Sequence, residues 1–393
     1  MINVGIWFDA PKNYFGGINY FKNLLYALSK HNPKEVKVFI FFSTDMPQET
    51  LDLFRPYASV VRTSILNRFS LKWFINQIFI RFFNSQLLIN QILKFYSIDV
   101  LSHSWSVFKP TSNIKVISWI PDFQYLHFPE YFSNFSTLEE TKRLQKIISY
   151  SDLVVLSSEN AHNDFKNIAL PCDNEKGVVM NFVSQPDFEL VKNNPINLET
   201  KFNFKGKYFY LPNQFWEHKN HSVVFKAVKI LKDKGLDITL ICSGETIDHR
   251  KNNDKYFKKL LNFIETNNLS NNIKILGKID YVEVLSLIKG SVATINPSYF
   301  EGWSSTVEES KSFNKTVILS NIDVHKEQNP KKGIFFSPDN SKDLAKIMEH
   351  EWCNYLSINK KDNIKDDMVD LENRTSQFGK KYFDIIKKIS NGI

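Results

Sequence analysis

The sequence predicts an α/β fold made of two doubly wound, Rossmann-like domains that face each other across a cleft. A chain of 393 residues is longer than one hydrophobic core usually supports. Short apolar runs alternate with helical patterns in both halves, as in parallel sheets covered by helices on both faces. This alternation stops in the polar segment 186–206 and then starts again, so we expect a domain boundary there.

In the first half, residues 2–8 form an apolar run that predicts a strand. A loop with Gly16 and Gly17 and a helix from about residue 20 follow it. The other expected strands are 36–42, 99–101, 115–119 and 153–156, and the expected helices are 137–150 and 159–167. Together these elements predict a first domain over residues 1–190.

In the second half, the same alternation predicts a second domain over residues 200–365. Its expected order is strand 208–211, helix 220–233, strand 238–242, helix 255–267, strand 273–276, helix 281–288, strand 292–295, helix 305–313 and strand 317–319. The periodic stretch 374–389 predicts an amphipathic helix. We expect the terminal segment, 370–393, to return to the first domain.

The composition is that of a globular protein, with 42% hydrophobic and 23% charged residues. A net charge of +8 favours an anionic partner, but no recognition motif for nucleic acid accompanies it. Cys172, Cys242 and Cys353 are too far apart to suggest a disulfide framework or a zinc site. The N-terminus lacks the features of a signal peptide, so a cytoplasmic protein is expected.

The most informative motif lies between an expected strand and an expected helix, at residues 297–309. Ser305 with Glu308 three positions later predicts a capping box, and therefore a helix that begins at Ser305. The free amides and positive dipole at such a helix end would bind a diphosphate. Glu301 and Glu309 flank this position, where carboxylates can accept hydrogen bonds from sugar and ribose hydroxyls. The alternative is a plain helix cap with a solvated Glu301.

A second motif is the segment 211–221, at the first turn from strand to helix in the second half. Such turns face the ligand crevice of an open α/β sheet. Lys219 can therefore reach a phosphate there. The alternative is an ordinary solvated lysine.

These residues resemble the retaining GT-B glycosyltransferases of family four, the type that builds bacterial surface polysaccharides such as lipopolysaccharide, O-antigen or capsule. In that family two glutamates separated by seven residues follow a Pro-Ser tract, as Glu301 and Glu309 follow Pro297-Ser298. Lys219 matches the family's phosphate-binding lysine. The resemblance covers nearly all of the chain and is weakest from 50 to 97 and after 350.

The resemblance implies transfer of a sugar from a UDP- or GDP-linked donor, which is a substrate, with no cofactor. Lys219 would neutralise the departing diphosphate, Glu301 would hold the donor sugar and Glu309 would hold the ribose. The acceptor would be a saccharide or a lipid-linked saccharide. The further donor contacts that we expect are Gly16, Gly17, Gln214, Gly277, Ser298, Gly302, Trp303, Ser304, Ser305 and Thr306.

Two departures from the family pattern concern charge and catalysis. Gln214 stands where an arginine is usual, and Pro121-Asp122 stands where a His-Asp pair is usual. Asp122 remains the best first-domain candidate for a catalytic contact with sugar, ahead of His127 and His103. The alternative is that Asp122 caps a turn.

The sequence has no D-x-D tract, the usual means of binding a metal to sugar-nucleotide phosphates in the other large glycosyltransferase fold. We therefore expect no metal site, with charge neutralised by Lys219 and the helix N-terminus.

The segment 68–96 mixes many apolar residues with Arg68, Lys72, Arg81 and Lys94. It is too interrupted to span a bilayer. One interpretation is a helix packed on the first sheet, which we prefer; the other is a peripheral helix on an anionic membrane, at the inner face of the plasma membrane.

Two other functions fit the same architecture. A sugar-nucleotide epimerase would act on a similar ligand without an acceptor. A non-catalytic nucleotide-sugar-binding protein is favoured by Gln214 and by the missing histidine.

Overall fold

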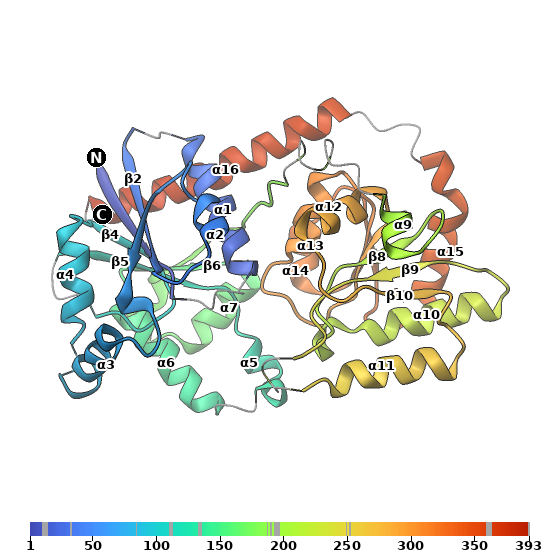
Figure 1. Ribbon diagram of the computed structural model, residues 1–393, viewed down its shortest axis with the longest axis horizontal. Coiled ribbons are helices and arrows are strands. Elements are labelled where there is room, and N and C mark those ends of the chain that lie inside the picture. Colours follow the sequence, from blue (N-terminus) through green and yellow to red (C-terminus); the bar gives the residue numbers. More distant parts are fainter. Residues whose placement is uncertain are drawn as a thin grey trace. The chain divides into compact units, whose positions relative to one another are not determined.

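Two α/β units with parallel sheets make up the chain in a computed structural model (Figure 1), as the sequence predicts. The structure describes residues 1–9, 15–31, 34–83, 85–109, 113–132, 136–186, 188, 191, 197–248, 250, 253–358 and 364–391. Residues 187, 189, 190 and 192–196 of the expected boundary segment, 186–206, lie outside these residues. Contacts group Met1–His127, Phe135–Val183 and Glu372–Ile393 in the first unit, and Phe128–Asn134 and Ser184–Leu371 in the second.

The first unit holds a seven-stranded parallel sheet in the order β3-β2-β1-β4-β5-β6-β7. The register places Val4 opposite both Val38 and Val100. The strands are β1 (Ile2–Trp7), β2 (Val36–Ser43), β3 (Ser59–Thr63), β4 (Val100–Ser104), β5 (Lys115–Ile120), β6 (Leu153–Leu156) and β7 (Gly177–Val179).

Helices surround this sheet, and the C-terminal helix packs against the first one. Gly379 of α16 comes so close to α1 that a Cβ there would lie 2.2 Å from the carbonyl oxygen of Ala27. Tyr382 then donates its hydroxyl to Ser102 Oγ at 2.8 Å. The helices are α1 (Phe15–Ser29), α2 (Gln48–Asp52), η1 (Ser64–Leu66), α3 (Leu71–Phe83), α4 (Leu87–Phe95), α5 (Gln124–His127), α6 (Thr137–Tyr150), α7 (Glu159–Ile168), η3 (Pro171–Lys176) and α16 (Ile364–Ser390).

The second unit holds a six-stranded parallel sheet in the order β10-β9-β8-β11-β12-β13. Its strands are β8 (Phe209–Leu211), β9 (Leu240–Cys242), β10 (Ile273–Ile275), β11 (Thr294–Asn296), β12 (Val317–Ser320) and β13 (Gly333–Phe336). Its helices are η2 (Pro129–Tyr131), α9 (Leu198–Phe202), η4 (Glu217–Lys219), α10 (His221–Asp233), α11 (Lys255–Thr266), α12 (Tyr281–Gly290), α13 (Ser305–Ser312), α14 (Asp323–Gln328) and α15 (Ser341–Ile358).

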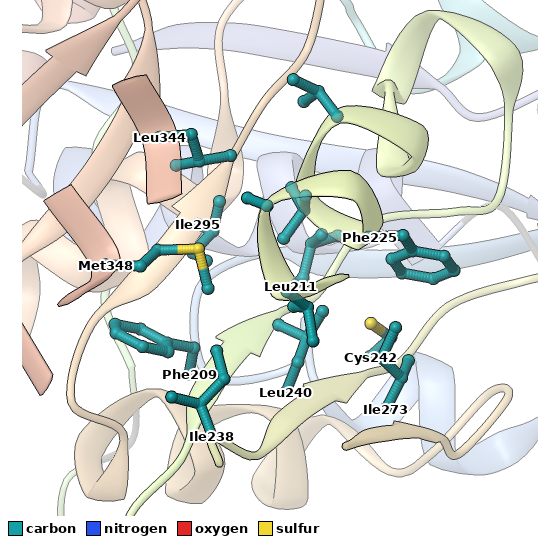
Figure 2. Packing of buried hydrophobic residues seen from close by; sticks show 14 of the residues in the cluster. Phe209, Leu211, Phe225, Ile238, Leu240, Cys242, Ile273, Ile295, Leu344 and Met348 are labelled. Carbon is teal, nitrogen blue, oxygen red and sulfur yellow. The ribbon is translucent and has the colours of Figure 1, made fainter. Parts of the chain in front are cut away.

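The core of the second unit lies between its sheet and the helices α10 and α15. Phe209, Leu211 and Leu240 from the strands are fully buried against Phe225 of α10 and Met348 of α15 (Figure 2). This packing covers one face of the sheet with helices, as is usual in parallel sheets. It fixes the strand ends from which the functional loops emerge.

The segment predicted either to pack on the first sheet or to lie on a membrane divides in two. Ile89 and Leu93 of α4 are buried in a cluster with Trp7, Phe41 and Leu101. The described side chains of α3 add no hydrophobic residue to the buried core. The preferred interpretation therefore holds for α4 and is wrong for α3. In the described part of the chain, no helix has the length and apolarity needed to cross a lipid bilayer.

Candidate functional site

In the second sheet, the order in which the chain adds strands reverses between β8 and β11. The chain runs from β8 outward to β9 and β10, and then returns to the other side of β8 with β11. Ligands of open α/β sheets bind at such a switch point, beyond the carboxyl ends of the strands. The loop after β8 carries Lys219, and the loop after β11 carries Glu301. The fold therefore brings the two predicted motifs together.

Asn220 joins these two loops. Its backbone is left-handed, with φ of 52°, which an asparagine tolerates better than most residues. Its buried side-chain amide donates to the carbonyl oxygens of Pro297 (3.2 Å) and Pro338 (2.8 Å). Tyr299 adds a backbone bond to the carbonyl oxygen of His218 (2.8 Å). Lys219 is thereby held on a fixed backbone beside the β11 loop.

Lys219 and Glu301 form an ion pair in which Nζ lies 2.7 Å from Oε1. Their side chains are only 12% and 9% exposed. Ser298 Oγ lies 2.6 Å from the same carboxylate oxygen and donates to it. Burial alone would raise the pKa of Glu301, but the charge of Lys219, together with His325 and Ser298, outweighs it and lowers the pKa. Glu301 is therefore ionised at neutral pH.

His325, which the sequence did not single out, lies close enough to Glu301 for its protonated form to lower the pKa of Glu301. Its Nδ1 lies 2.9 Å from the carbonyl oxygen of Ser320, and its ring is fully buried. Burial lowers the pKa of His325, although the charge of Glu301 acts in the opposite direction. The ring is thus neutral at neutral pH. A histidine in a short polar helix gave no periodic or spacing signal.

The helix α13 begins at Ser305, as predicted, but the predicted capping box is wrong. The N-cap is Ser304, whose Oγ accepts from the amide of Val307 at 3.3 Å. Glu308 instead bonds to Lys311 (2.9 Å) and Gln328 (3.1 Å). The cap moves by one residue because Ser304 is buried, where Asn296 donates to its Oγ at 2.7 Å, while Ser305 is exposed.

The amides of Ser305 and Thr306 open the helix and have no partner in the preceding turn. Gln328 fixes the residue before them, since it accepts from the amide of Ser304 (3.2 Å) and donates to its carbonyl oxygen (3.0 Å). Thr306 Oγ1 contacts Asn213 Oδ1 in the β8 loop at 3.4 Å. The predicted residues Gly302 and Trp303 are half-buried in the loop that leads to this helix end. This arrangement can bind an anion.

Glu309 contacts the first residue of helix α12. Its Oε1 accepts from the hydroxyl of Tyr281 at 2.9 Å. Burial raises the pKa of Glu309 to about 7, and the hydrogen bond from Tyr281 only partly offsets this. Tyr281 was not predicted, because an aromatic residue at a helix start resembles any other surface aromatic.

Two glycines shape the same edge. Gly277, an expected donor contact in the loop after β10, is left-handed, with φ of 67°, and its carbonyl oxygen accepts from the amide of Gly244 at 2.9 Å. Gly244 was not predicted. A Cβ there would lie 2.3 Å from the carbonyl oxygen of Asn213. Gln214, an expected donor contact that stands where the family usually has an arginine, has an exposed side chain.

In the first unit, Gly16 and Gly17 lie in the first turn of α1, so the predicted glycine loop is wrong at these positions. The helix starts at Phe15, earlier than expected, and its buried apolar face includes Ile18. Asp9 and Ser106, which follow β1 and β4, bond to each other at the switch point of this sheet. Sequence reasoning gave neither of them a role.

The three predicted first-domain candidates have structural partners. Asp122 Oδ1 accepts from the amide of Gln124 at 3.0 Å, just before α5. His127 Nε2 lies 2.8 Å from Asp164 Oδ2. His103 is fully buried between Tyr20 and Ser102, and burial lowers its pKa to about 3. His103 is therefore a structural residue, whereas Asp122 keeps its predicted role as a proposal.

The described residues contain no group of three or more His, Cys, Asp or Glu side chains placed to hold a metal ion.

Residues 196–351, which contain the whole Lys219–Glu301 site, match the family model described as glycosyl transferases group 1. No curated protein matches the chain.

Solved structures share the fold over the full length. A glycosyltransferase from Rickettsia africae ESF-5 is 18% identical, with 99% of this chain and 98% of that one covered, at a TM-score of 0.65. Anabaena Alr3699/HepE in complex with UDP and glucose is 14% identical, with 100% and 98% covered, at 0.62. The lipopolysaccharide outer core galactosyltransferase WaaB in its apo form is 16% identical, with 98% and 99% covered, at 0.60.

Proposed function

We propose that this chain, which the family match and the shared GT-B fold support as a glycosyltransferase, transfers a sugar from a nucleotide-sugar donor with retention of configuration and without a metal ion. The observation that carries the proposal is the buried pair of Lys219 and Glu301 beside the N-terminus of α13. One cation, one anion and free amides meet there at the switch point of the sheet.

The diphosphate of the donor is assigned to Lys219 and the amides of Ser305 and Thr306. An ammonium group has three N–H donors, and Glu301 uses one of them. The others remain available to a phosphate oxygen. The helix end adds the partial positive charge that favours an anion. The complex of the similar HepE with UDP and glucose supports a UDP-linked donor; a GDP-linked donor remains the alternative.

Glu301 is assigned to the donor sugar. Its ionised carboxylate is an acceptor only, which suits sugar hydroxyls. Ser298 and Lys219 both bond to Oε1, which leaves Oε2 to receive a hydroxyl. Glu309, together with Tyr281, is assigned to the ribose hydroxyls.

In the proposed reaction, the bond between the anomeric carbon and the diphosphate oxygen breaks, and the acceptor hydroxyl oxygen forms the new bond on the same face. The acceptor proton passes to the departing phosphate. Lys219 and the α13 amides stabilise the negative charge that develops on that phosphate, which is usually the largest catalytic term. In the first unit, Asp122 is assigned to a contact with sugar. Gly16 and Gly17 are assigned to donor contacts.

The proposed acceptor is a saccharide or a lipid-linked saccharide of the bacterial surface. The shared fold of the lipopolysaccharide galactosyltransferase WaaB supports this assignment. The corresponding location is the cytoplasmic side of the plasma membrane.

A panel of UDP- and GDP-sugars, with released nucleotide as the readout, tests the proposal. We expect release from one donor to rise when an acceptor is added and to be unchanged by a chelator. An epimerase would give an isomerised donor without any acceptor, and a binding protein would give neither product. Inactivation by the chelator would contradict the absence of a metal.

A further inference from the structure

One side of α3 is an exposed apolar stripe. Leu71, Phe74, Ile75, Ile78 and Phe82 are all exposed, with Leu71 at 75% and Phe82 at 74%. Their spacing of three, four, seven and eleven residues from Leu71 places them on one face of the helix. A helix on the surface of a globular protein normally turns its apolar face toward the core.

The opposite side of α3 carries Trp73 and Ile80, which are only half-buried, and the polar Asn76. The most buried of its described side chains is the polar Asn76, at 4% exposure, and the Oδ1 of Asn76 has no hydrogen-bond partner among the described residues. Burial of an amide without a partner costs free energy. Packing beneath the helix therefore does not explain why the apolar stripe faces outward.

Phe69, just before α3, extends the stripe. Its φ of 69° is rare for an aromatic residue, and its ring is 76% exposed. The ring centroid lies 5.7 Å from that of Trp73 and 6.4 Å from that of Phe74. Trp, Phe and Leu are the residues typical of the apolar face of helices that lie at a membrane surface.

Basic residues border the stripe on both sides. At about 100° per residue, Lys72 lies on one flank of the stripe and Arg81 on the other. Both are exposed, and in the described part of the chain neither pairs with a carboxylate. No Asp or Glu occurs between Asp52 and Asp99, whereas six basic residues do: Arg55, Arg62, Arg68, Lys72, Arg81 and Lys94.

We propose that the stripe of α3, named here the α3 face and made of Phe69, Leu71, Phe74, Ile75, Ile78 and Phe82, docks in the plane of an anionic lipid surface. An apolar stripe flanked by basic residues is the pattern of helices that lie at the boundary of headgroups and acyl chains. Anionic headgroups complement Lys72 and Arg81. A second copy of the chain would instead bring like charges together across a symmetric contact.

The position of the α3 face connects it with the reaction. Helix α3 follows η1, which begins where β3 ends, and it contacts η1 and α4 (Figure 1). The first sheet is parallel, so its strands end at the same edge as β1 and β4, where ligands of such sheets bind. Given the proposed function, a membrane at this face would present a lipid-linked acceptor to the first unit.

Flotation with vesicles tests the docking without donor or acceptor, so its result is independent of the proposed function. We expect the full chain to bind vesicles that contain phosphatidylglycerol and to bind pure phosphatidylcholine vesicles weakly, with binding that decreases as salt is added. Ile78→Asp should weaken binding about tenfold or more. Lys72→Ala and Arg81→Ala should each weaken it about fivefold.

The matched control is Leu138→Asp, which places the same charge on an exposed leucine of α6 in the same unit. It should leave binding unchanged, and all variants should keep the thermal unfolding temperature of the parent. Equal binding by Ile78→Asp and the parent would overturn the proposal. So would a dimer in solution that Ile78→Asp dissociates, combined with no affinity for either vesicle.

Discussion

Lys219 and Glu301 are 82 residues apart in the sequence, yet Nζ and Oε1 lie 2.7 Å apart in a largely buried pair. Neither side chain is solvated, so the alternatives of a solvated Glu301 and an ordinary solvated Lys219 are wrong. The two residues meet because β8 and β11, whose following loops carry them, are neighbours in the sheet. Because each charge neutralises the other, removal of either one should affect both folding and chemistry.

Replacement of Lys219 by alanine should lower both stability and turnover. It leaves the Glu301 carboxylate buried without its counter-ion, which costs about 3–5 kcal/mol of unfolding free energy. Turnover should fall about 10²-fold or more, because the leaving phosphate loses its cation. Denaturant titration and nucleotide release measure the two effects.

Lys234→Ala is the control, since it breaks the exposed pair of Lys234 with Glu349 at 2.8 Å. It should cost about 1 kcal/mol or less and leave turnover intact. The double variant Lys219→Met with Glu301→Gln should recover much of the lost stability but none of the activity. Simple additivity of the two stability losses would show that the pair is not coupled.

The stability should depend on pH through Glu309. Its folded pKa of about 7 exceeds the ordinary value of 4.5, so between these pH values the folded state holds a proton that the unfolded state has lost. Unfolding free energy should therefore fall as pH rises from 4.5 to 7 and then level off. Glu309→Gln removes this loss, so its stability relative to the parent should rise by about 3 kcal/mol at most across that window. A pH-independent difference between the two proteins would contradict the buried carboxylate.

Gly244→Ala should displace the loop after β8. The new Cβ would lie 2.3 Å from the carbonyl oxygen of Asn213, in a backbone with φ of 151°. Gly235→Ala is the matched control: its φ of 82° imposes a similar conformational penalty, but no atom lies within 4 Å. We expect Gly244→Ala to cost about 1–3 kcal/mol more than the control and to weaken donor binding, as unfolding and calorimetry would show. Equal stability losses would mean that the close approach of the two loops is unimportant.

The sequence predicted the alternation of strands and helices well, because buried parallel strands leave continuous apolar runs such as 36–42. It failed at local caps. Ser304 and Ser305 are both good N-cap residues, and only the bond from Asn296 selects the first.

Tertiary placement explains the other omissions. His325, Tyr281 and Gly244 matter through neighbours that are distant in sequence, which no local pattern records. The helix at 71–83 was expected to pack on the sheet, and no sequence pattern shows that Leu71, Phe74, Ile75, Ile78 and Phe82 stay exposed.

Calorimetric titration of nucleotide sugars into the parent chain and Lys219→Arg and Lys219→Ala tests the central claim most directly. We predict that one UDP- or GDP-sugar binds the parent, that arginine keeps part of the affinity, and that alanine lowers it about tenfold or more, as loss of a charged hydrogen bond to phosphate should. Unchanged affinity in Lys219→Ala, or no heat with any nucleotide sugar, would contradict the placement of the diphosphate beside Lys219 and the N-terminus of α13.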